Sequence, residues 1–164
     1  MGATANDGRT AVERRSDREL TVTRTFDAPP RLVWDAWTRP ELFQRWWAPK
    51  SSGVPMLSCE MDVRTGGGYR IAFGHDAASA MAFYGKYIEV SPPSRLVWTN
   101  DEGDADGAVT TVTFEARDGG TRVVLSELYP TKEELDASYV GMEGGYPEQF
   151  DQLNDLLSVL AAGA

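Results

Sequence analysis

Residues 26–49 spell FDAPPRLVWDAWTRPELFQRWWAP, the stretch with the strongest structural signal in the chain. It holds four of the five tryptophans and four of the nine prolines. Proline suits the first position of a helix and disfavours helix in the residue before it, so Pro30 and Pro40 predict the starts of two short helices. Pro49 is expected to end the second helix. The aromatic density predicts a helical lid over an apolar interior.

Strand signals lie on both sides of this stretch. Leu20 and Val22 predict a strand that ends at Phe26. After the lid, strands are expected at about residues 57–64, 69–73, 81–90, 96–100, 109–117 and 121–128. Short turns rich in Gly, Pro and Asp join these strands, which predicts an antiparallel sheet.

The last part of the chain predicts two helices. Thr131 is a suitable cap for a short one, and a longer one is expected from about 143 to 161. The longer helix has an apolar face made of Tyr146, Phe150, Leu153, Leu157 and Leu160. Because that face must be buried, the sequence predicts an α+β fold in which a curved antiparallel sheet grips a long C-terminal helix. Residues 1–18 are polar and are expected to be a disordered leader to a single domain over 19–162.

Composition excludes several classes of protein. A net charge of −9 argues against nucleic-acid binding, which needs clustered Lys and Arg. The single cysteine, Cys59, suits a reducing compartment and is expected to be a buried, inert thiol. No apolar run approaches the roughly 18 residues that span a bilayer, and the first residues lack the apolar core of a signal peptide. We therefore expect a cytoplasmic protein without membrane or nucleic-acid partners.

Several segments together resemble the SRPBCC superfamily (START, polyketide cyclase and pollen-allergen-like proteins), in its branch named for the activator of the heat-shock protein 90 ATPase. They are residues 26–49, DVRTGG at 62–67, YGKYIEVSPPSRLV at 84–97, VTF at 112–114 with GTRV at 120–123, and GMEGG at 141–145. The resemblance covers about residues 20–160. It implies a helix-grip fold around a ligand cavity. Members include lipid and hormone carriers, aromatase-cyclases and self-sacrificing resistance proteins, so it leaves the chemistry open.

Inward-facing residues of this fold are the candidate cavity lining. They are Trp46, Tyr69, Phe73, Tyr84, Trp98, Asn100, Glu127, Tyr146 and Phe150. Each ring either fills the core or forms a cavity wall, and Asn100 offers both a donor and an acceptor. The direction of Tyr84 is open, because Gly85 is consistent with a bulge. Among the lid tryptophans, we expect Trp34 and Trp37 to anchor the lid by packing and Trp46 to contact a ligand.

Glu127 is the one candidate catalytic residue. Strand alternation places it on the inward face with Val123 and Leu125, where a carboxylate needs a partner. Two readings stay open. Glu127 is either solvated at the cavity mouth, or inside as a ligand-orienting group or general base.

Other motifs give no site. His75 is the only histidine, so a zinc site of the usual kind is not expected. The acidic loop over 101–107 lacks the glutamate that a calcium loop needs at its twelfth position. No cofactor is expected, and Asp62 with Arg64 predicts a surface ion pair.

Three function classes remain. The leading one is a binding protein for an apolar, aromatic or lipid-like small molecule held in an internal cavity. The alternative is a cavity-based enzyme of cyclase, hydratase or hydrolase type that uses Glu127. A chaperone partner is the third, favoured only by the branch name. Exposed strand edges are compatible with a homodimer.

Overall fold

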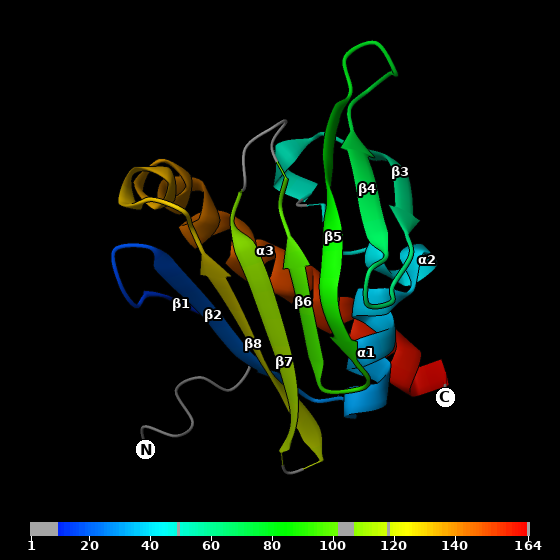
Figure 1. The fold of residues 1–164 in the computed structure, drawn as a ribbon. Coiled ribbons are helices and arrows are strands. Elements are labelled where there is room, and N and C mark those ends of the chain that lie inside the picture. Colours follow the sequence, from blue (N-terminus) through cyan, green and yellow to red (C-terminus); the bar gives the residue numbers. More distant parts are fainter. Residues whose placement is uncertain (1–9, 49, 102–106, 118, 164) are drawn as a thin grey trace.

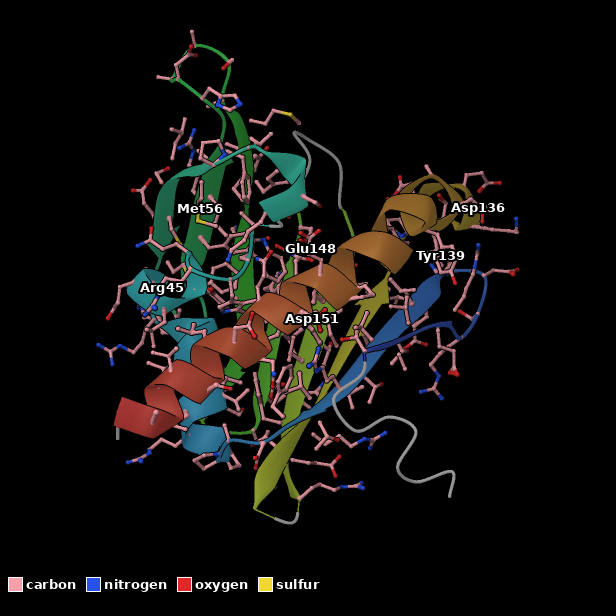
Figure 2. The ribbon with its side chains drawn as sticks, turned by 180° about the vertical axis from the view of Figure 1, so that it is seen from behind. Arg45, Met56, Asp136, Tyr139, Glu148 and Asp151 are labelled. Atoms are coloured by element: carbon pink, nitrogen blue, oxygen red, sulfur yellow. The ribbon has the colours of Figure 1, made fainter. Side chains whose placement is uncertain are left out.

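The computed structural model describes residues 10–48, 50–101, 107–117 and 119–163. Its elements are β1 (Ala11–Arg14), β2 (Glu19–Phe26), α1 (Pro30–Thr38), α2 (Pro40–Phe43), η2 (Lys50–Ser52), β3 (Met56–Met61), β4 (Gly68–Phe73), β5 (Met81–Ser91), β6 (Arg95–Thr99), β7 (Val109–Arg117), β8 (Gly120–Leu128) and α3 (Lys132–Gly163). The strands form one antiparallel sheet of eight strands in the order β1-β2-β8-β7-β6-β5-β4-β3 (Figure 1). Helix α3 lies across one face of this sheet (Figure 2). The predicted helix-grip fold is confirmed.

The two short helices begin at the predicted prolines, Pro30 and Pro40. The second helix is shorter than predicted, since it ends at Phe43. The reason lies in α3: Gln152 Nε2 donates to the carbonyl oxygens of Trp46 and Ala48, both at 2.9 Å. These carbonyls are therefore satisfied without a continuing helix.

Trp37 joins the lid to both other layers of the fold. Its ring centroid lies 4.7–6.4 Å from six other rings. These rings belong to Phe43, Trp46, Trp47, Trp98, Phe114 and Phe150. Trp34 packs edge-on against Phe114 at 5.5 Å. Both tryptophans are buried and anchor the lid by packing, as predicted.

The N-terminal part differs from the expected disordered leader. Ala11–Arg14 forms β1 and pairs antiparallel with β2, so the sheet begins inside the segment assigned to the leader. Arg14 also forms an ion pair with Asp136 on α3, at 2.5 Å. Four residues are too few for the alternation that identifies a strand in a sequence.

Helix α3 is one element where two helices were expected. It runs for 32 residues with Pro147 inside, although proline costs a helix one backbone hydrogen bond. Packing offsets this cost, because the predicted apolar face is buried against the sheet and the lid, except for Leu160, which is only partly buried. Tyr146, Phe150, Leu153 and Leu157 are each 6% exposed or less.

Candidate ligand-binding site

A cavity of about 290 Å³ lies between the lid, α3 and the half of the sheet formed by β3 to β6. Its apolar wall includes Trp37, Phe43, Trp47, Ile71, Phe73 and Trp98. Tyr69, Asn100 and Gln149 bring the polar groups. The volume is near the lower end of the roughly 300–1,000 Å³ found for small-molecule sites.

The cavity opens at the start of β5. Phe83 lines the cavity and is also 52% exposed, so its ring lies at the mouth. Phe73 meets this ring edge-on at 5.6 Å. The entrance is therefore apolar, like the wall behind it.

Three side chains of α3 hold the chain that follows α2, and we call Glu148, Gln149 and Gln152 the lid latch. Gln149 Nε2 donates to the Trp47 carbonyl at 2.5 Å, and the Lys50 amide donates to Gln152 Oε1 at 2.9 Å. Glu148 accepts from the Ser51 amide at 2.9 Å and from its hydroxyl. These hydrogen bonds lower the pKa of the exposed Glu148 carboxyl. Figure 2 shows Glu148 on α3, beside the segment that it binds.

A chain of hydrogen bonds leads from the cavity wall into the core. The Tyr69 hydroxyl donates to the Thr99 carbonyl at 2.7 Å and approaches Asn100 Oδ1 at 3.3 Å. Asn100 Nδ2 donates to the Ala108 carbonyl and to Thr110 Oγ1, both at 2.9 Å. Thr110 Oγ1 then donates to Glu127 Oε2 at 3.0 Å.

Glu127 ends this chain inside the protein, and of the two readings the structure has the buried one. The residue is 8% exposed. Hydroxyl groups of Thr110, Tyr129 and Tyr146 bind its carboxyl group. Burial raises the pKa of Glu127, while these three hydrogen bonds lower it without cancelling the rise. Glu127 does not belong to the cavity wall, because Asn100 and Thr110 lie between.

The structure gathers four of the nine predicted lining residues in the wall: Tyr69, Phe73, Trp98 and Asn100. Trp46 is fully buried, and its indole Nε1 donates to the Ala36 carbonyl at 2.9 Å. Its neighbour Trp47 takes the place in the wall. Tyr146 and Phe150 lie in the core behind the cavity, where Tyr146 meets Glu127.

Tyr84 points away from the cavity and is 38% exposed. The register shift of β5 lies between Tyr87 and Glu89, so Phe83, Gly85 and Tyr87 share the inward face. Gly85 does not mark the bulge; its position has no room for a side chain. A Cβ at this position would lie 2.0 Å from the Thr99 carbonyl oxygen.

Sequence reasoning missed several wall residues. The parity of β5 would have indicated Tyr87 and Phe83 had Gly85 been placed inward. Trp47 and Gln149 gave no such signal, because their positions depend on how the lid meets α3.

The remaining candidates from the sequence, Cys59 and the pair Asp62 and Arg64, lie outside the cavity wall. Cys59 was expected to be buried and is only half-buried. This burial raises the pKa of its thiol to about 11, so the thiol stays protonated at neutral pH. Asp62 and Arg64 form the predicted exposed ion pair at 2.9 Å.

Most of the acidic loop, residues 102–106, lies outside the described residues. Within the described residues, no group of three His, Cys, Asp or Glu side chains could hold a metal ion. The same part of the chain contains no helix with the length and apolar character needed to cross a membrane.

Solved structures share this architecture along nearly the whole chain. A protein of Rhodobacter sphaeroides is 26% identical with a TM-score of 0.83, over 92% of this chain and 99% of its own. A protein of Mycobacterium smegmatis is 25% identical with a TM-score of 0.77, over 93% and 99%. The AHSA1-like protein of Aeromonas hydrophila, at 24% identity, shares the fold with a TM-score of 0.69, over 88% and 94%.

The curated proteins include no match to this chain. The model of one protein family, described as Activator of Hsp90 ATPase homolog 1-like protein, matches residues 27–158. That match includes the lid, β3 to β8 and most of α3. The chain therefore belongs to the family of activator of Hsp90 ATPase homolog 1-like proteins.

Proposed function

We propose that the protein binds an apolar or aromatic small molecule in the cavity between the lid and the sheet. The observation that carries this proposal is a space of about 290 Å³ that aromatic side chains surround without filling. Protein interiors are normally packed as densely as organic crystals, with few voids larger than a water molecule. An apolar space of this size, with an apolar entrance at Phe83, therefore suits a ligand that leaves water for it.

An enzyme of cyclase, hydratase or hydrolase type is the second candidate, favoured by the buried Glu127. Its raised pKa is a property of catalytic acids and bases. A general base must reach the proton that it takes, directly or through one water. Because Asn100 and Thr110 separate the carboxyl group from the cavity, the binding role is the better supported of the two.

An effect on Hsp90 is a separate hypothesis, tested by adding the protein to an Hsp90 ATPase assay.

The binding role is tested with N-phenyl-1-naphthylamine, a neutral dye whose fluorescence rises in apolar surroundings. Ile71→Phe adds atoms to the cavity wall, whereas Ile88→Phe adds the same atoms at a position that is 51% exposed. The wild-type protein and Ile88→Phe should bind the dye alike. Ile71→Phe should bind about tenfold more weakly, a loss of about 1.4 kcal/mol. Equal binding by both variants would place the dye elsewhere, and no binding to the wild type would refute the proposal.

A further inference from the structure

The polar end of the cavity is formed by Tyr69 and Asn100, whose hydrogens already have partners. The single hydroxyl hydrogen of Tyr69 is directed to the Thr99 carbonyl at 2.7 Å. Both hydrogens of the Asn100 amide are used, one by the Ala108 carbonyl and one by Thr110 Oγ1. Neither side chain has a hydrogen left to donate to a ligand.

The orientation of the Asn100 amide follows from its partners. The Ala108 carbonyl can only accept a hydrogen bond, so the atom 2.9 Å from it must be the nitrogen. Thr110 accepts from the same nitrogen because its own hydrogen goes to Glu127 Oε2, at 3.0 Å. The amide oxygen Oδ1 is therefore on the other side, where the only contact that it receives from the described residues is the long one of 3.3 Å from Tyr69. This oxygen has the capacity to accept a second, stronger hydrogen bond.

The electrostatics at this end disfavour a negatively charged ligand. The described residues of the cavity wall include no Lys, Arg or His. Burial first, and then the charges of Tyr87, Asp101 and Glu127, raise the pKa of the Tyr69 hydroxyl. The same causes act against any anion placed beside Tyr69, because an unpaired charge in an apolar site is costly.

We propose that the ligand is a neutral aromatic molecule of roughly two or three rings with a hydroxyl group that donates to Asn100 Oδ1. This inference rests on the proposed binding function and adds to it the chemistry of the recognised group. The aromatic wall takes the ring system and Asn100 takes the hydroxyl hydrogen. A ligand without that hydrogen leaves the oxygen unpaired, and a carboxylate places acceptor against acceptor.

A matched set of ligands tests this on the wild-type protein by isothermal titration calorimetry at pH 7. The set is 2-naphthol, 2-methoxynaphthalene and 2-naphthoate, which share one ring system. One hydrogen bond to a buried acceptor is worth about tenfold in Kd, so 2-naphthol should bind about tenfold more tightly than the methyl ether. The naphthoate should bind most weakly. If the ether binds as tightly as the naphthol, or the naphthoate binds more tightly, this inference is wrong and the binding function stands. If none of the three binds, and the neutral dye does not bind either, the binding function itself fails.

Two variants identify the accepting atom. Asn100→Leu removes Oδ1 and should bring the Kd ratio of ether to naphthol from about ten to about one. Tyr69→Phe removes the neighbouring hydroxyl, keeps the ring, and leaves Oδ1 free, so the ratio should be preserved or increased. Because the readout is a ratio of two ligands, a loss of general binding moves it little. A ratio that collapses in Tyr69→Phe would assign recognition to Tyr69 and overturn the role of Asn100. If Asn100→Leu does not fold, the Tyr69→Phe result and the ligand series still decide.

Discussion

Glu127 is a carboxyl group surrounded by hydroxyl groups, a setting in which the neutral form competes well with the charged one. Thr110, Tyr129 and Tyr146 supply the hydroxyls, and burial is the largest influence on its pKa. A folded-state pKa above the unfolded one gives stability that is present at low pH. That stability is lost as the pH rises from about 4.5 through the folded-state value.

Glu127→Gln should therefore remove a pH dependence from the stability of the protein. The variant lacks the titrating group, so its stability relative to wild type should improve between pH 5 and pH 8. The change is about 1.4 kcal/mol for each unit by which folding raises the pKa within that range. Urea unfolding at both pH values measures it, with exposed Glu133→Gln as the control. A stability difference that is the same at pH 5 and pH 8 would show that the folded-state pKa is not raised.

Gly85 should not tolerate a side chain. In Gly85→Ala, the new methyl group would lie 2.0 Å from the Thr99 carbonyl oxygen and 2.9 Å from the Tyr69 ring. Strands β5 and β6 must separate, and we expect a loss of about 2–4 kcal/mol in the free energy of unfolding. Gly145→Ala is the matched control, because a Cβ there meets nothing within 4 Å and the helix gains about 0.5–1 kcal/mol. Chemical denaturation of both variants measures the contrast, and an unchanged Gly85→Ala would contradict the close approach.

Two side chains of the lid latch bind two neighbouring amides separately. The Lys50 amide depends on Gln152 and the Ser51 amide on Glu148. Gln152→Leu should therefore speed hydrogen exchange at Lys50 about tenfold, and Glu148→Ala should do the same at Ser51. Each variant is the control for the other. Equal effects at both amides would mean that the latch opens as one unit.

Acid should weaken the contact between Glu148 and Ser51 in this latch. Hydrogen bonds from Ser51 lower the pKa of Glu148, so the stabilisation is present above the unfolded value of about 4.5. It is lost as the pH falls through the lower folded-state value. Exchange at Ser51 relative to Lys50, compared between pH 6 and pH 3 after correction for intrinsic rates, should rise in acid. No change in that ratio would mean that the Glu148 contact contributes nothing to the latch.

Strands were easier to predict than helix ends, for a physical reason. Apolar alternation is local, so the predicted range 109–117 coincides with β7. Helix α3 continues through Gly141 and Pro147, two residues that disfavour a helix interior. Burial of Phe150 and its neighbours outweighs their cost. The helix α2 ended early for the opposite reason, since side chains of α3 bind the carbonyls that follow it.

Contacts between distant segments also limited the prediction of the site. Strand parity was enough for Tyr69, Phe73 and Asn100, because a strand shows its inward face in its own sequence. The cavity also needs Trp47 and Gln149, which meet only because the chain after α2 lies against α3.

The cavity lies against one half of the sheet, so a bound ligand should stabilise the two halves to different degrees. It touches the lid, α3 and the strands β3 to β6, while β1, β2 and β8 belong to the other half of the same sheet. A ligand that binds only the folded protein stabilises it by about 2.7 kcal/mol at a hundredfold excess over Kd. With saturating 2-naphthol, we expect amide exchange to slow first in β3 to β6 and in the lid, which open locally around the cavity.

Amides of β1 and β2 should slow only as far as they exchange through global unfolding. Hydrogen exchange with mass spectrometry, with and without 2-naphthol, resolves the two halves, and Ile71→Phe serves as the variant whose cavity is reduced. Protection confined to β1 and β2 would place the ligand on the opposite side of the molecule from the cavity. Protection of β3 to β6 that disappears in Ile71→Phe would tie the stabilisation to the cavity, since the added ring occupies the space that the ligand needs.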